Sequence, residues 1–163
     1  MKALSGYPQW FWLLAKGWKD IENRNWATKY RGRVLLHASR HIDTDCDEYI
    51  HERLSDRQWD EYSQMDWRKI AGCIIGEVDI VDCVWVQNKG LPATRSPWFT
   101  GIFGFVTANP VLYPESIPYR GQPSIFNIPC SVEVPCCDRR DEYNGFASGP
   151  LLFPCPHHCG CHD

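Results

Sequence analysis

One short polar stretch decides the fold, and it reads Gly17-Trp18-Lys19-Asp20-Ile21-Glu22-Asn23-Arg24-Asn25-Trp26. Its one aliphatic residue, Ile21, predicts an extended segment that buries this side chain. Because strand side chains alternate between the two faces of a sheet, Glu22 and Arg24 would then share the opposite face. Lys19 lies at the start of this strand, so the sequence predicts a small pocket lined by a lysine, a carboxylate and a guanidinium.

The residues on either side predict a buried helix followed by two strands. A helix start is expected within residues 5–8, where proline is tolerated in the first turn. Residues 10–16 are apolar almost all round, which predicts a buried helix, and Gly17 fits its C-terminal cap. The two strands are expected near residues 19–26 and 33–38.

Further along, the pattern predicts one more helix and three more strands. Cys46, Ile50 and Leu54 recur every four residues, which favours an amphipathic helix in an acidic segment. Residues 71–86 form a β-branched run with alternating acidic residues, typical of a strand with one face in water. The remaining expected elements are a strand over 98–107, a proline-rich connection over 110–123 and a strand over 124–128. Together these elements predict an α+β domain around a small curved sheet or barrel.

Composition and charge are those of one soluble domain. The 163 residues contain 44% hydrophobic and 23% charged residues, which is enough to bury a core. No apolar run reaches the roughly 18 residues needed to cross a bilayer, and no secretory signal is recognisable. We therefore expect a cytoplasmic protein that has no membrane partner.

The charged residues are segregated along the chain. Residues 1–42 carry eight Lys or Arg against two acidic residues, whereas residues 43–67 carry nine acidic residues against two Arg. A basic block that also holds the polar stretch favours an anionic partner such as nucleic acid. The alternative is two solvated faces of opposite sign that partly neutralise each other.

Nine cysteines are a high count for this length. Cys46, Cys73 and Cys83 lie in patterns typical of small buried side chains. The other six lie near the C-terminus, where the chain reads Cys155-Pro156-His157-His158-Cys159-Gly160-Cys161-His162. These thiols and imidazoles could hold zinc, with Cys136-Cys137 as further ligands, or form a metal-scavenging tail without a defined site. No firm cofactor follows from the sequence.

Several short motifs follow one another in a characteristic order. They are Ala3-Leu4-Ser5, Trp10, Gly17-x-Lys19-x-x-Glu22-x-Arg24-x-Trp26, Tyr30-Arg31-Gly32, His37-Ala38-Ser39, Gly72-Cys73-Ile74-Ile75-Gly76, Val81-Asp82-Cys83, Ser96-Pro97, Asn109-Pro110, Tyr119-Arg120-Gly121 and Phe126. Their order closely resembles the ASCH family, a branch of the PUA-like superfamily. The resemblance covers residues 1–129 as one ASCH domain and leaves 130–163 as a Cys- and Pro-rich C-terminal extension.

The resemblance implies an α+β fold, namely a small PUA-like β-barrel with flanking α-helices and a cleft lined by the lysine motif. The family is generally taken to bind nucleic acid, which implies RNA, single-stranded nucleic acid or a modified nucleotide as the partner. Some members resemble enzymes, with a ribonuclease activity in one and removal of acetyl from acetylated cytidine in a more distant relative. The lysine matching Lys19 is catalytic in that relative, where the position matching Glu22 is a threonine.

Lys19 and Glu22 are the candidate catalytic residues. Lys19 could act as nucleophile or base if it is desolvated beside other cations, or contact a phosphate or carbonyl if it stays charged. Glu22 could act as a general base, or it could hold Arg24 in a fork-like ion pair. The alternative for the pair is a salt bridge with no catalytic consequence.

The candidate nucleic-acid-binding residues are aromatic side chains that could stack on a base and arginines that could contact phosphates. They are Trp18, Arg24, Tyr30, Arg31 and Arg120. His37, at the end of a buried strand, is either a core histidine or a site residue.

The sequence therefore favours a nucleic-acid-binding domain that recognises RNA or a modified nucleotide in a cleft around Lys19, Glu22 and Arg24. The second hypothesis is a small hydrolase on the same ligands, either a ribonuclease or an acylated-nucleoside amidohydrolase. The third is a metal-dependent interaction protein that uses the Cys/His tail.

Overall fold

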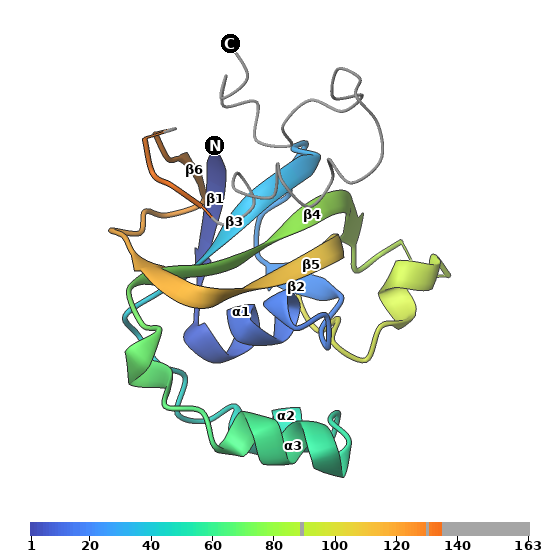
Figure 1. Ribbon diagram of the computed structural model, residues 1–163. Helices are drawn as coiled ribbons and strands as arrows, with labels where there is room; N and C mark the ends of the chain where they lie inside the picture. Colours follow the sequence, from blue (N-terminus) through green and yellow to red (C-terminus); the bar gives the residue numbers. More distant parts are fainter. Residues whose placement is uncertain (89, 130, 135–163) are drawn as a thin grey trace, which may run out of the picture.

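The computed structural model describes residues 1–88, 90–129 and 131–134. They form a six-stranded sheet in the order β2-β5-β4-β3-β1-β6, curled into a half-barrel with three flanking helices (Figure 1). This confirms the predicted α+β class and the curved sheet. The strands are β1 (Lys2–Gly6), β2 (Ile21–Arg24), β3 (Gly32–Ala38), β4 (Cys73–Trp85), β5 (Phe103–Pro118) and β6 (Ile125–Asn127). The helices are α1 (Pro8–Ala15), α2 (Asp47–His51) and α3 (Asp56–Ser63), with short 3-10 turns η1 (Trp67–Lys69) and η2 (Pro92–Arg95).

The helix α1 packs against β3, β4 and β5 and is buried along nearly its whole length, as predicted. Its C-terminus is closed by two hydrogen bonds, from the Gly17 amide to the Leu14 carbonyl and from the Trp18 amide to the Leu13 carbonyl, both 3.0 Å. Gly17 has a φ of +70°, the left-handed conformation that this cap requires. The turn therefore places Lys19 directly before β2.

The strand β1 was missing from the sequence-based prediction, which placed a helix start within residues 5–8. Ser5 in fact belongs to a strand, and the helix begins at Pro8. β1 pairs in parallel with β3 and antiparallel with β6. Both partners are distant in sequence, so no local pattern indicated this strand.

The predicted proline-rich connection was also wrong, because β5 continues through it to Pro118. β2 pairs with β5 only as far as Val106. Beyond that point one edge of β5 has no neighbouring strand among the described residues, and an edge tolerates prolines. On its other edge β5 pairs with β4, and the register between these two strands shifts at several points, as at β-bulges.

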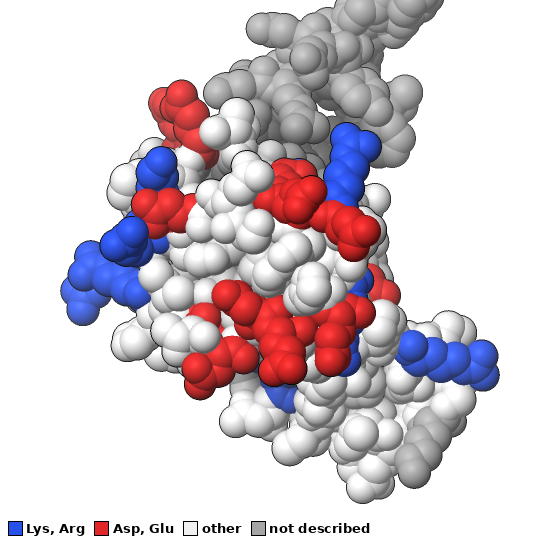
Figure 2. All heavy atoms as spheres, turned by 90° about the horizontal axis from the view of Figure 1, so that it is seen from below, with Lys and Arg blue, Asp and Glu red and all other residues white. Residues whose placement is uncertain are grey.

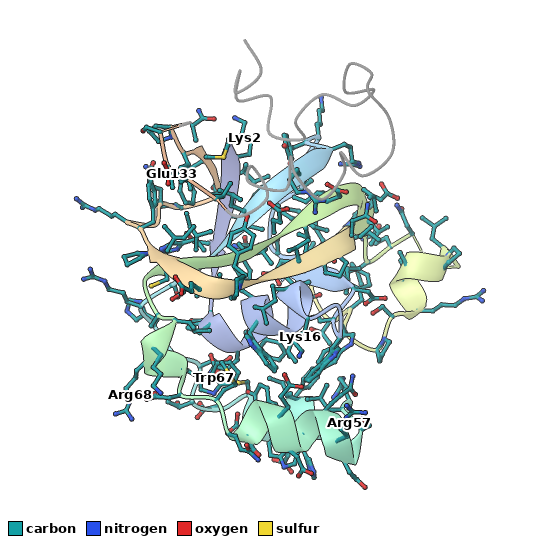
Figure 3. All side chains as sticks on the ribbon, viewed as in Figure 1. Lys2, Lys16, Arg57, Trp67, Arg68 and Glu133 are labelled. Atoms are coloured by element: carbon teal, nitrogen blue, oxygen red, sulfur yellow. The ribbon has the colours of Figure 1, made fainter. Side chains whose placement is uncertain are left out.

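The acidic segment forms two helices rather than one. Ser55 ends the first part and caps α3 in a capping box with Gln58. Cys46 and Ile50 are buried as predicted. α2 and α3 form a layer below α1, where Trp67 of η1 packs edge-on against Trp12 with ring centroids 5.7 Å apart (Figure 3).

Acidic side chains gather on the outer surface of this helical layer, which faces the viewer in Figure 2. The exposed acidic residues from the start of α2 to the end of α3 are Asp47, Glu48, Glu52, Asp56, Asp60 and Glu61. The predicted wet face of β4 is only partly correct: Asp82 is exposed, but Glu77 is buried and accepts a hydrogen bond of 2.8 Å from the Tyr113 hydroxyl.

A second, smaller apolar cluster covers the other part of the sheet. Its buried members are Ala3, Leu35, Ile74, Tyr113, Phe126, Ile128 and Val134. Val134 is thus part of a core cluster, although it lies beyond residue 129.

His37 of β3 is a core histidine. Its Nε2 lies 2.9 Å from the Tyr119 carbonyl oxygen and its Nδ1 lies 3.0 Å from Ser5 Oγ. A carbonyl can only accept, so Nε2 carries the proton and Ser5 donates to Nδ1. Burial lowers the pKa of His37 below its usual value, and hydrogen bonds to backbone carbonyls oppose this only in part.

We expect His37 to make stability depend on pH. Below about pH 6.5 the unfolded chain takes up a proton that the buried imidazole resists, so the free energy of unfolding decreases as the pH falls. Urea unfolding at several pH values should show a flatter dependence for His37→Gln than for the wild type. His41→Gln, a change at an exposed histidine, should keep the wild-type slope. An unchanged slope in His37→Gln would contradict this account.

Candidate functional site

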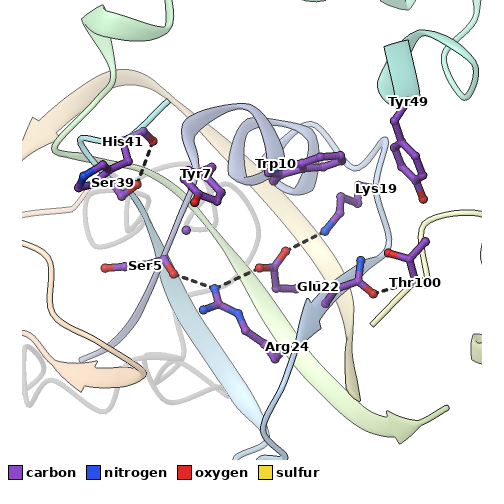
Figure 4. A pocket seen from close by; sticks show the side chains of 12 residues that line it. Ser5, Tyr7, Trp10, Lys19, Glu22, Arg24, Ser39, His41, Tyr49 and Thr100 are labelled. Carbon is purple, nitrogen blue, oxygen red and sulfur yellow. Dashed lines mark hydrogen bonds and ion pairs between the residues drawn. The ribbon is translucent and has the colours of Figure 1, made fainter. Parts of the chain in front are cut away.

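A pocket of about 750 Å³ opens between β2, one edge strand of the sheet, and the end of β1, beyond the residues of β1 that pair with β6 (Figure 4). Its inner surface is formed by Lys19, Glu22 and Arg24, which we call the charged floor. The rest of the lining comes from the end of β1, the start of α1, β2, the segment after β3, α2 and the loop before β5. These lining residues are Ser5, Gly6, Tyr7, Trp10, Asn23, Ser39, His41, Tyr49 and Thr100.

The charged floor is one continuous chain of ion pairs. Lys19 Nζ donates to Glu22 Oε2 over 2.7 Å, and Arg24 Nη2 lies 3.1 Å from Glu22 Oε1. Ile21 is buried on the opposite side, as the strand pattern predicted. The alternation of β2 therefore sets the carboxylate and the guanidinium side by side, and the turn after α1 adds the lysine.

Arg24 also joins two strands that do not pair with each other. Its Nη2 donates to the Ser5 carbonyl oxygen over 2.7 Å, which links β2 to the end of β1 across the gap. The Ser5 carbonyl points toward the guanidinium in Figure 4. The half-barrel is held at this point by a side chain, so the space beside it stays open as a pocket.

Lys19 is desolvated, but its close partner is a carboxylate. The residue is only 2% exposed, and Glu22 is 7% exposed. From the sequence, Lys19 could be a nucleophile if it were desolvated beside other cations. Lys19 is indeed desolvated, but the group beside it is the carboxylate of Glu22. The observed ion pair instead holds the ammonium as a hydrogen-bond donor.

The wall above the floor is aromatic. Lys19 Nζ lies 5.8 Å from the centroid of the Trp10 ring, within reach of a cation–π contact. The indole of Trp10 donates to Asp43 Oδ2 over 3.0 Å and packs edge-on against Tyr49. Tyr7 is 47% exposed at the rim and makes no hydrogen bond from its side chain to the described residues. These rings offer flat apolar surface to a ligand.

Asn23 fixes the remaining rim. Its Oδ1 accepts from the amides of Thr100 and Gly101, both at 3.0 Å, and its Nδ2 donates to the Trp98 carbonyl over 2.7 Å. Sequence reasoning did not select Tyr7, Asn23 or Tyr49 as site residues. Of these three residues, only Asn23 could have been selected from the sequence, because it lies between Glu22 and Arg24 in the motif.

Four of the predicted binding residues do not line the pocket. Trp18 packs edge-on against Trp12, with ring centroids 5.2 Å apart, and its ring offers no stacking surface to the pocket. The Tyr30 hydroxyl donates to a backbone carbonyl, and burial raises its pKa. Arg31 pairs with Asp82 at 2.9 Å, and Arg120 is exposed. Contacts of these four residues with nucleic acid remain predictions.

Most of the N-terminal basic residues are committed to ion pairs. Carboxylate partners within 4 Å are found for Lys16, Lys19, Arg24, Arg31 and Arg33. Within residues 1–42 this leaves Lys2, Lys29 and Arg40 without an ion pair to any described residue. Most of the basic block is therefore neutralised by carboxylates and does not form a broad cationic surface.

The predicted metal site cannot be placed, because the Cys/His tail and Cys136-Cys137 lie outside the described residues. Within the described part of the chain, no group of three or more His, Cys, Asp or Glu side chains could hold a metal ion. No helix in that part is long and apolar enough to span a membrane.

Comparison with known proteins agrees with the fold and the motif. Residues 4–104 match the family described as the ASCH domain, and this match includes the whole charged floor. The chain belongs to the ASCH family. It is 28% identical over 134 residues to "Activating signal cointegrator 1" of Homo sapiens and 29% identical over 129 residues to the protein of that name in Mus musculus. These matches cover 77% of this chain but 22% of each relative, so the ASCH chain spans about a fifth of their length. Family membership places it in the PUA-like superfamily and supports a role related to nucleic acid.

We expect the charged floor to contribute strongly to stability. Glu22→Gln removes the charge that both cations share, and breaking a buried pair should lower the free energy of unfolding by about 3 kcal/mol. Lys19→Met should lower the free energy of unfolding by less, because Glu22 keeps Arg24 as an ion-pair partner. Urea unfolding measures both changes.

The control is Asp82→Asn, which breaks the exposed pair with Arg31 and should cost less than about 1 kcal/mol. If Glu22→Gln cost no more than this control, the charged floor would be an ordinary surface salt bridge.

Proposed function

We propose that the pocket of this ASCH domain is a recognition site for a base of single-stranded RNA or for a modified nucleotide. The observation that carries the proposal is an open pocket with aromatic side chains above a fixed, cation-rich floor. An aromatic ring can stack on any base, and the cations can meet its polar edge. The family supports the same class of ligand.

Base recognition is favoured over binding along the phosphate backbone. A protein that tracks a backbone needs many cations free to displace counterions. In this chain most N-terminal cations already have carboxylate partners, and the helical layer exposes an acidic surface (Figure 2). A small number of phosphate contacts could still be made by Arg40 and Arg120. Arg40 lies between two residues that line the pocket.

Tyr7→Ala should weaken binding of a short single-stranded RNA. The ring is exposed at the rim, so its loss should spare the fold and remove a stacking surface worth about 1–3 kcal/mol per base. Fluorescence anisotropy with a labelled RNA should therefore show an affinity lower by about 5-fold to 150-fold.

Trp85→Ala is the matched control, because Trp85 is an aromatic residue 41% exposed that does not line the pocket. It should bind like the wild type. Equal affinity of Tyr7→Ala and the wild type would argue against the pocket as the binding site.

The second candidate is a hydrolase on the same ligands, favoured by one observation: Lys19 Nζ and Glu22 Oε2 lie 2.7 Å apart on the floor of the pocket. However, both Glu22 oxygens already face cations, which leaves the carboxylate poorly placed to accept a proton from water. We therefore favour the recognition module.

Mass spectrometry after incubation with short RNAs and acylated nucleosides separates the two candidates. We expect no product from the wild type. Product formed by the wild type and absent with Lys19→Ala would make the domain a hydrolase and place Lys19 in its mechanism.

A further inference from the structure

The charged floor holds more hydrogen-bond donors than the protein satisfies. A guanidinium has five N–H donors and an ammonium has three. In Arg24, Nη2 makes both of the contacts to Ser5 and Glu22, whereas Nε is buried and has no hydrogen-bond partner among the described residues. Neither Nη1 of Arg24 nor a second N–H of Lys19 has an acceptor in that part of the chain. Nε is enclosed by the protein, whereas Nη1 is accessible and is therefore the Arg24 donor that an acceptor supplied from outside can reach.

The floor has no uncommitted acceptor to match these donors. Glu22 is its one carboxylate, and each of its oxygens faces a cation at 2.7 or 3.1 Å. The carboxylate lies between the two cations in Figure 4. Two cations against one anion leave the floor with a charge of +1. A ligand group that donates hydrogen bonds would therefore find no free acceptor on the floor. A group that accepts hydrogen bonds would find donors.

We infer that the pocket selects a nucleobase that turns a ring carbonyl toward Lys19 and Arg24, and discriminates against bases that lack one. The inference rests on the proposed function and names the class of base. Uracil, cytosine and guanine carry such a carbonyl, whereas adenine presents ring nitrogens and an amino group that donates. Arginine and lysine are the side chains that read carbonyl oxygens on base edges.

A free phosphate also has acceptor oxygens, but the surroundings favour a flat ring. Trp10 lies over the Lys19 ammonium, and Tyr7 and Tyr49 complete an aromatic lining. The volume of about 750 Å³ is also larger than one phosphate requires. Aromatic walls add stacking energy for a base and nothing comparable for an anion.

The test uses two short adenosine RNAs that differ at one central position, which holds inosine in one and unsubstituted purine in the other. Inosine carries a carbonyl at C6 and a hydrogen on N1, where purine has a hydrogen at C6 and an N1 that accepts. Because the floor donates, the change at N1 works against inosine, so a higher affinity for inosine must come from the carbonyl. Fluorescence anisotropy with the full chain should give an affinity about tenfold higher for the inosine RNA, since a hydrogen bond to a charged donor is gained. Inorganic phosphate should not displace either RNA at constant ionic strength.

Arg24→Met tests the donors directly. It removes every N–H donor of Arg24, so the ratio of the affinities for the inosine and purine RNAs should fall, although Lys19 remains. Circular dichroism checks the fold of this variant. If the variant is unfolded, the affinities of the wild type for the two RNAs still test whether the pocket selects a carbonyl.

The outcomes separate this inference from the proposed function. Equal affinity for both RNAs, weakened in each case by Tyr7→Ala, would overturn carbonyl selection and leave base binding intact. Absence of any binding sensitive to Tyr7→Ala would overturn both. Displacement by inorganic phosphate would show that the floor binds an anion and would overturn the carbonyl inference.

Discussion

The Glu22 carboxylate is the group on which the site depends. It lies in a nearly dry environment between an ammonium at 2.7 Å and a guanidinium at 3.1 Å. The Lys19 ammonium could not remain buried without it, because an unpaired charge in such surroundings costs several kcal/mol. Through Arg24 the same chain of contacts reaches the Ser5 carbonyl and so holds β2 to β1. One carboxylate thereby couples the closure of the half-barrel to the chemistry of the pocket.

The pocket exists because this closure uses a side chain instead of a strand. Where β2 and β1 face each other, no ladder of backbone hydrogen bonds fills the gap between them. The charged floor lines the inside of that gap, and α1 and the loop fixed by Asn23 bring rings and polar groups to its edges. An ASCH domain of this design offers a concave, partly aromatic site on a scaffold that is otherwise well packed.

Much of the local structure could be predicted from the sequence, and the failures share one cause. Gly17 indicated its cap, and the period of two around Ile21 placed Glu22 and Arg24 correctly, because these are properties of neighbouring residues. β1 and the second half of β5 were missed, because their pairing depends on strands far away in the sequence. The same holds for Trp18, whose ring turns toward Trp12 instead of the pocket.

The sequence by itself determined the charged floor, since the alternation of one short strand and one glycine cap put a lysine, a carboxylate and a guanidinium together. It also determined the family, through the order of its motifs. Only the tertiary structure decided which cations have no carboxylate partner and so remain available to a ligand, and which aromatic rings surround the floor. Arg31 and Arg33 find their carboxylate partners on β4, and Tyr49 arrives from α2. Such partners lie tens of residues away in sequence, and only the pairing of β3 with β4 and the packing of α2 bring them into place.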